Sequence, residues 1–184
     1  MTEGDGQAFV ALFSGINVGG NRIVKMAELR AFFEELGFGG VATYIQSGNV
    51  VFRAVSSDAA ALRKQVETAF ETRWGFRSRI MLRDLGWYER LVANNPYPEV
   101  ANDPTKLHAY VLEREPTGEE VAPLVERCAG PERFEVRDDV LYLHAPDGLG
   151  KSKFAELLPR LLKVPATARN WRTVLTLLDM ARKA

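Results

Sequence analysis

Two kinds of hydrophobic spacing alternate along residues 9–82, and their order restricts the fold more than any other feature of the chain. Short apolar runs that suit buried strands alternate with stretches whose apolar residues recur every three or four positions, as on one face of a helix. Between two of the runs lies Ser47-Gly48, where glycine permits a tight hairpin turn. The expected elements are a strand at 9–14, a helix at 26–36, strands at 41–46 and 49–54, a helix from 57 or 58, and a strand at 77–82. This order, βαββαβ, predicts a ferredoxin-like unit.

The second half of the chain repeats most of this order. Thr117 and Glu120 form a capping box that opens a helix, and Asp138-Asp139 separates the two strands of a hairpin. The expected elements are a strand at 107–113, the helix from 117, strands at 134–137 and 140–144, and a helix from 151. The order βαββα predicts a second, incomplete ferredoxin-like half, and a basic helix is expected from about Asn170.

We therefore predict an α+β protein of two ferredoxin-like halves with antiparallel sheets and a C-terminal helix. Three prolines lie within residues 96–104, a composition typical of a linker. The expected domains are residues 1–93 and 107–184, joined by a linker at 94–106.

The charge of the chain is balanced overall but unevenly distributed. The 184 residues include 24 basic and 24 acidic side chains, so net charge does not hold the protein on nucleic acid or a membrane. Residues 151–184 nevertheless carry a net charge of +6, and the first 150 residues carry −6.

The single cysteine, Cys128, excludes an internal disulfide and a multi-thiolate metal site. No apolar run reaches membrane-spanning length, and residues 1–7 lack the charged and apolar regions of a secretion signal. We expect a cytoplasmic protein with no metal, no cofactor and no membrane partner. An oligomeric state is not predicted.

Two polar loops that contain glycine provide the candidate site. In the ferredoxin-like topology they leave the same end of the sheet, because the third strand pairs beside the first. Backbone N–H groups and cationic side chains in such loops can bind a phosphate or carboxylate. The loops at 15–22 and 46–49 therefore predict a site for a small anionic or polar ligand, with these candidate residues: Asn17, Gly19, Gly20, Asn21, Arg22, Lys25, Gln46, Ser47 and Asn49. The alternative is that glycine and asparagine serve tight turns only, since both tolerate positive φ.

Three stretches resemble the signature motifs of the bacterial family called domain of unknown function 1697. They are residues 9–21 (FVALFSGINVGGN), 44–52 (YIQSGNVVF) and 167–174 (TARNWRTV), and in that order they span nearly the whole chain. The usual opening of the family has arginine where this chain has Ser14. The resemblance implies a fold and a place for the site but no established activity, so neither a reaction nor a catalytic residue is predicted.

Residues 145–152 nearly match the phosphate-binding P-loop, with Ala145 in place of the first glycine. A working P-loop follows a strand of a parallel sheet and needs a later aspartate that binds magnesium. Here the preceding strand belongs to a hairpin, and Asp179 is the only later aspartate. We interpret the segment as a turn followed by the start of a helix.

The basic C-terminal region at 151–184 offers an alternative function, association with nucleic acid. Trp171 lies among cationic residues there, and Arg169 and Arg172 are the candidate contacts to phosphate. The competing interpretation is that Trp171 belongs to the buried face of the last helix, because apolar residues follow it at helical spacing.

Overall fold

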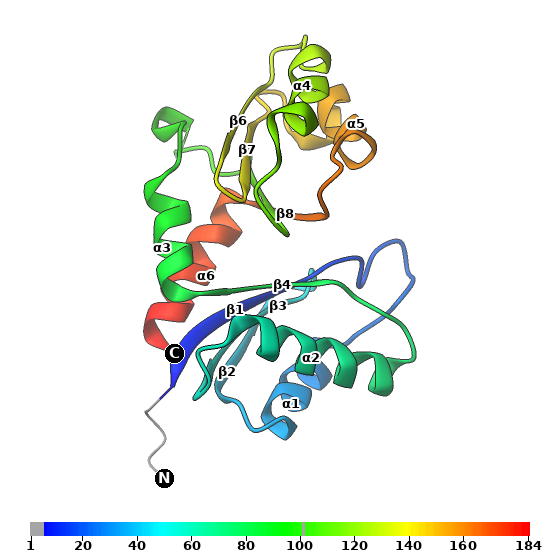
Figure 1. The fold of residues 1–184 in the computed structure, drawn as a ribbon, viewed down its shortest axis with the longest axis vertical. Helices are drawn as coiled ribbons and strands as arrows, with labels where there is room; N and C mark the ends of the chain where they lie inside the picture. The colour runs from blue at the N-terminus through cyan, green and yellow to red at the C-terminus, as the bar shows by residue number, and fades with distance from the viewer. Residues whose placement is uncertain (1–5, 101) are drawn as a thin grey trace. The chain divides into compact units, whose positions relative to one another are not determined.

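The computed structural model describes residues 6–100 and 102–184, and it contains two four-stranded sheets (Figure 1). The chain divides into two compact units: the chain through Arg90 together with Thr176–Ala184, and Leu91–Leu175. The boundaries fall within α3 (Leu85–Ala93) and α6 (Trp171–Lys183). The domains predicted at 1–93 and 107–184, with a linker at 94–106, stay a prediction. In the described part of the chain, no helix is both long and apolar enough to cross a lipid bilayer.

The first unit has the predicted ferredoxin-like order. Its elements are β1 (Gln7–Phe13), α1 (Met26–Glu35), β2 (Gly39–Tyr44), β3 (Asn49–Ala54), α2 (Ala59–Trp74) and β4 (Ile80–Asp84). The strands form one sheet in the order β2-β3-β1-β4, and every neighbouring pair is antiparallel. Helices α1 and α2 cover one face of this sheet (Figure 1).

Strand β1 is central in the sheet and is buried from Ala8 to Phe13. Burial on both faces explains why its sequence is a continuous apolar run instead of an alternation of apolar and polar residues. On the helix side, the ring of Phe13 lies 6.1 Å from that of Phe33 and 5.1 Å from that of Phe70. Such aromatic pairs stabilise the core by about 0.5–1.5 kcal/mol beyond the burial of their area.

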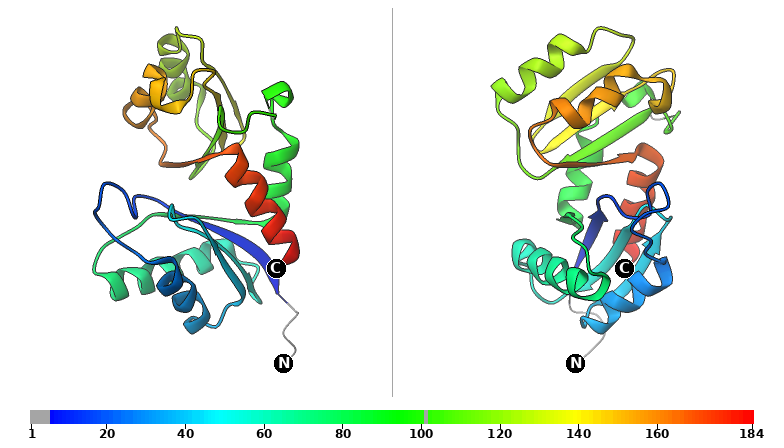
Figure 2. Two further views of the ribbon diagram at one scale, coloured as in Figure 1. Left: turned by 180° about the vertical axis from the view of Figure 1, so that it is seen from behind. Right: turned by 90° about the vertical axis from the view of Figure 1, so that its right-hand side faces the viewer.

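The second unit repeats this topology. Its elements are β5 (Leu107–Leu112), α4 (Gly118–Arg127), β6 (Arg133–Arg137), β7 (Val140–His144), α5 (Lys153–Leu161) and β8 (Ala166–Asn170), with short 3-10 turns η1 (Pro98–Val100) and η2 (Leu149–Lys151). The sheet order is β6-β7-β5-β8, which matches the first sheet strand for strand. Figure 2 shows α4 and α5 on one face of this sheet. The predicted fold class, two ferredoxin-like halves with antiparallel sheets and a C-terminal helix, is confirmed.

Strand β8 corrects the expected βαββα order, because it makes the second half complete. Hydrophobic spacing missed the strand because two of its buried residues, Thr167 and Arg169, are polar. One guanidinium nitrogen of Arg169 donates hydrogen bonds of 2.8 Å to Thr167 Oγ1 and to the carbonyl oxygen of Ala168. These bonds offset part of the cost of burying the charged group, and no pattern of apolar residues can signal such a strand.

His108 on β5 makes the stability of the fold sensitive to pH. The residue is buried, and its Nδ1 atom has no hydrogen-bond partner. Burial lowers the pKa of His108 from 6.5 to about 4. Between these two values the unfolded chain binds a proton that the folded chain does not, so the free energy of unfolding rises with pH, by up to about 1.4 kcal/mol per pH unit.

We expect urea unfolding to show this slope in the wild type and to show a much flatter profile for His108→Gln. His144 is a matched control, because burial lowers its pKa too but the side chain is more exposed. The variant His144→Gln should keep most of the slope. An unchanged slope in His108→Gln would contradict the assignment to His108.

Candidate functional site

The loop that follows β1 and the connection between β2 and β3 lie at the same end of the first sheet, as predicted. The backbone N–H of Phe13 donates a 2.9 Å hydrogen bond to the carbonyl oxygen of Gly48, and the side-chain amide of Asn17 donates one of 2.8 Å to the carbonyl oxygen of Gln46. In Figures 1 and 2 the longer loop, in dark blue, projects beyond the strand ends of its sheet. The two candidate loops are therefore directly bonded to each other.

The longer loop ends in a small hairpin. The backbone N–H of Asn21 donates a hydrogen bond to the carbonyl oxygen of Val18, and the backbone N–H of Asn17 donates one to the carbonyl oxygen of Arg22, both at 3.1 Å. Gly19 and Gly20 lie between them with φ of 58° and 76°, the left-handed values that a type I′ turn requires at both positions. The glycines thus build a tight turn, and in the described part of the chain the backbone N–H groups of Gly19 and Gly20 donate no hydrogen bond.

Two of the candidate asparagines stabilise the loops from inside. The Asn17 side chain donates to the carbonyl oxygens of Val24 and Gln46 and accepts the N–H of Val24 at 2.8 Å. Asn49 is fully buried, and its amide donates to the carbonyl oxygen of Tyr44 and to Ser47 Oγ. Both side chains therefore hold the loops together through hydrogen bonds to the backbone and to Ser47.

Exposed cationic side chains surround the hairpin. Arg22 lies on it with φ of 51°, and its guanidinium carbon is 5.6 Å from the centre of the Phe76 ring. Among the described residues, no carboxylate lies within ion-pair distance of Arg22, whereas Lys25 pairs with Glu28 at 3.4 Å. The Arg22 guanidinium is therefore the cation at these loops that is most available to an anion.

Apolar side chains are also exposed on the two loops. Val18, Ile23 and Ile45 are 66%, 61% and 49% exposed. Ile45 has φ of 49°, which is a strained conformation for a β-branched residue. The end of the sheet therefore combines a cation, two glycine N–H groups with no hydrogen bond among the described residues, and exposed apolar surface.

A third segment reaches this end of the sheet, and the sequence did not indicate it as part of the site. The backbone N–H of Ser14 donates to the carbonyl oxygen of Arg79, and Ser78 Oγ donates to the carbonyl oxygen of Ser14. The segment before β4 thus adds Phe76 and the exposed Arg79 to the candidate site. The sequence could have indicated this segment only through the expected pairing of β4 with β1, which places the start of β4 beside the end of β1.

The model of the family described as "Protein of unknown function (DUF1697)" matches residues 7–142, which include both loops. The chain belongs to the DUF1697 family. The conserved bacterial protein SP0830 from Streptococcus pneumoniae, whose structure has been solved, is 27% identical to it, with a TM-score of 0.73. The similarity covers 95% of this DUF1697 chain and 98% of the streptococcal one. No curated protein matches. The resemblance found in the sequence is confirmed, and the family's description names no function.

In this DUF1697 protein the segment that resembles a P-loop, residues 145–152, lines a cavity of about 180 Å³ together with Gly130, Pro131, Glu132 and Lys153. The strand before it, β7, is antiparallel to both of its neighbours, unlike the strand of a P-loop.

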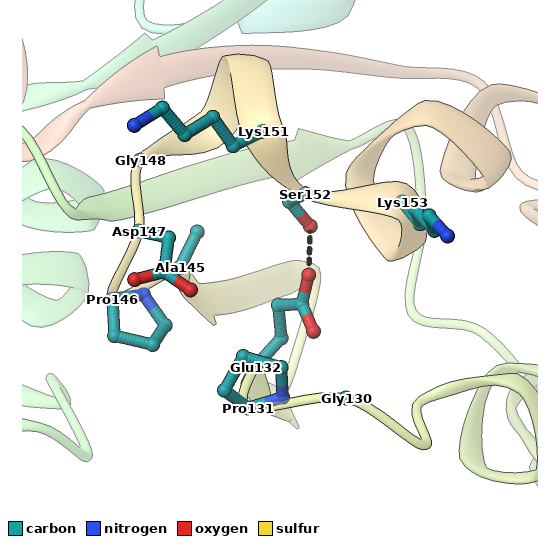
Figure 3. A pocket seen from close by; sticks show the side chains of 10 residues that line it. All are labelled: Gly130, Pro131, Glu132, Ala145, Pro146, Asp147, Gly148, Lys151, Ser152 and Lys153. Carbon is teal, nitrogen blue, oxygen red and sulfur yellow. Dashed lines mark hydrogen bonds between the residues drawn. The ribbon is translucent and has the colours of Figure 1, made fainter.

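Ser152 caps α5 by accepting the N–H of Ala155, and it donates to the carboxylate of Glu132 (Figure 3). The side chains of Lys151 and Lys153 extend in opposite directions. A carboxylate beside Ser152 would repel a phosphate, so the segment serves as a turn and helix cap.

The basic C-terminal region does not present its tryptophan to nucleic acid. Trp171 is 2% exposed, and its ring lies 6.2 Å from that of Tyr142. Arg169 is 8% exposed and is bonded within β8, while Arg172 is exposed. Since a buried indole cannot stack on a base, the alternative function gains no support from these residues.

Gly48 and Gly20 provide a test of how tightly the two loops are joined, because both have φ of 76° but differ in their surroundings. A Cβ on Gly48 would lie 2.5 Å from Ile16 Cδ1 and 2.9 Å from Phe13 Cβ, whereas one on Gly20 would meet nothing within 4 Å. We expect Gly20→Ala to lower the free energy of unfolding by about 1–2 kcal/mol through backbone strain alone. Gly48→Ala should lower it by about 1–3 kcal/mol more through overpacking.

Chemical denaturation of the two variants measures the difference. Equal losses of unfolding free energy in the two variants would show that the connection between β2 and β3 shifts to make room for a Cβ on Gly48. The packing of Gly48 against the first loop would then not restrict that connection.

Proposed function

We propose that this protein binds a small anionic ligand at the loops 15–22 and 46–49, with Arg22 as the principal contact to the anion. The observation that carries the proposal is the exposed Arg22 guanidinium, which has no carboxylate partner among the described residues and lies on a hairpin clamped by Asn17. A guanidinium that is held in place by structure loses less conformational freedom on binding than a free surface arginine.

Three further observations support this location. Gly19 and Gly20 are exposed, and within the described residues their N–H groups donate no hydrogen bond, so these groups can donate to an anion. Ser14 Oγ, at the base of the loop, is buried without a hydrogen-bond partner. Ile45 is held in a strained backbone conformation, and such strain is concentrated at functional sites.

The apolar side chains on the same loops indicate the rest of the ligand's chemistry. Val18 and Ile23 flank the hairpin turn, and Ile45 precedes Gln46 in the neighbouring loop. An anionic group joined to an apolar or planar moiety would contact Arg22 and these side chains together. Phosphate monoesters of small apolar molecules and small apolar carboxylic acids, which are both anionic at neutral pH, have this composition.

Thermal unfolding with inorganic phosphate and pyrophosphate as probes tests the proposal. A probe at about one hundred times its Kd adds about 2.7 kcal/mol to the free energy of unfolding. We expect Arg22→Ala to weaken binding by about 1.5–3 kcal/mol, which is tenfold or more, because it removes a charge-assisted hydrogen bond.

Arg30→Ala is the matched control, since Arg30 is an exposed arginine paired with Glu34 on α1. It should bind the probes as the wild type does. Equal losses in both variants would indicate nonspecific attraction by surface charge. Probe binding that is unchanged in Arg22→Ala would show that the site lies elsewhere.

A further inference from the structure

Strand β6 is an edge of the second sheet, and in the described part of the chain no strand pairs with its outer side. The two-residue turn at 138–139 makes Arg137 and Val140 a hydrogen-bonded pair, because they flank the turn directly. Hydrogen-bonded and non-bonded pairs alternate along an antiparallel ladder, so Phe134 and Val136 direct their N–H and C=O groups away from β7. The outer edge of β6 thus offers donors and acceptors to a further strand.

A groove of about 740 Å³ runs beside this edge, between β6 and α4, and its lining combines apolar side chains with the charged Glu115, Arg133 and Glu135. Helix α4 buries Leu124 in the core of its unit but lines the groove with Val121 and Val125, and Val125 is 62% exposed. From the strand, Phe134 and Val136 line the same groove. Backbone groups on an open edge next to apolar side chains form the type of surface to which an added β-strand binds.

The composition of the groove specifies what that strand must be. An antiparallel strand puts the residues opposite Phe134 and Val136 on the groove side, so these must be apolar, and the residues between them must suit the charged outer face. Strand β6 itself has this pattern, since Phe134 and Val136 alternate with Arg133, Glu135 and Arg137.

We propose that β6 pairs antiparallel with β6 of a second copy of this chain, and that the two sheets join into one continuous sheet. With Phe134 opposite its own copy on the two-fold axis, Arg133 of each chain lies opposite Glu135 of the other. The same two-fold axis brings the α4 helices together on one face, where each covers the exposed Val125 of the other.

The charges on β6 favour this register over its neighbour. If one strand shifts so that Phe134 lies opposite Val136 of the other chain, Glu135 of one chain lies opposite Glu135 of the other. Like charges directly opposite each other are destabilising. Within one chain, Arg133 pairs with Glu99 and Glu135 with Arg137, but these ion pairs are exposed. Exposed ion pairs contribute little, so exchanging them for pairs across the two-fold axis has little cost.

Sedimentation equilibrium of the full chain over a range of concentrations tests the proposal. We expect a species of twice the chain mass of 20.5 kDa. Val125→Glu should raise the dimer Kd about tenfold or more, because it buries two like charges against each other. Val55→Glu is the matched control, since Val55 is 91% exposed and belongs to the first unit. The dimer Kd of Val55→Glu should equal that of the wild type.

A charge reversal tests the register independently of Val125. Arg133→Glu and Glu135→Arg should each raise the dimer Kd, and the double variant should regain affinity because opposite charges again face each other across the axis. A wild type that stays monomeric at every concentration overturns the proposal and leaves the groove to a partner of another kind. A dimer that Val125→Glu does not weaken, or a double variant weaker than both single variants, overturns it as well.

Discussion

The pairing of β1 with both β3 and β4 is the constraint on which the candidate site depends. It brings three connections, distant in sequence, to one end of the sheet: the loop after β1, the turn before β3 and the segment before β4. Because β1 is buried on both faces, the end of this strand is a rigid anchor for the loop that follows it. The hairpin that carries Arg22 is thus an irregular segment with a well-defined base.

Polar residues in this region divide into those that hold the loops and those that face solvent. The amide groups of Asn17 and Asn49 are hydrogen-bonded within the loops, and Gly48 lies so close to Ile16 and Phe13 that a side chain there requires them to shift. Arg22 faces solvent. Residues that hold the loops and residues that face solvent therefore alternate within one short segment, which is why a motif rich in glycine and asparagine has two valid interpretations: the glycines form a turn, and the turn presents the residues beside them.

The two halves share a topology but differ in their connections and sheet edges. In the first unit, the connection from β1 to α1 is long enough to form a projecting hairpin, whereas the equivalent connection from β5 to α4 is short and ends in the capping box of Thr117 and Glu120. The second unit differs instead at its β6 edge, where α4 leaves Val125 exposed. The two units thus share their strand order, whereas their connections and edges, which the core does not restrict, differ.

The sequence by itself determined the element order of the first half and the hairpins of both halves, because hydrophobic spacing and turn glycines act locally. The ferredoxin-like order of that first half in turn predicted that the two loops meet at one end of the sheet. The sequence also located Trp171 on an apolar face. Only the tertiary structure decided that β8 is a strand, because the buried Arg169 is stabilised by hydrogen bonds that no hydrophobic pattern encodes. It likewise decided that Asn17 is a clamp and Arg22 is available, because the partner of Asn17 lies 29 residues away. Local spacing predicts the elements; the partner of a polar side chain depends on contacts that exist only after those elements have packed.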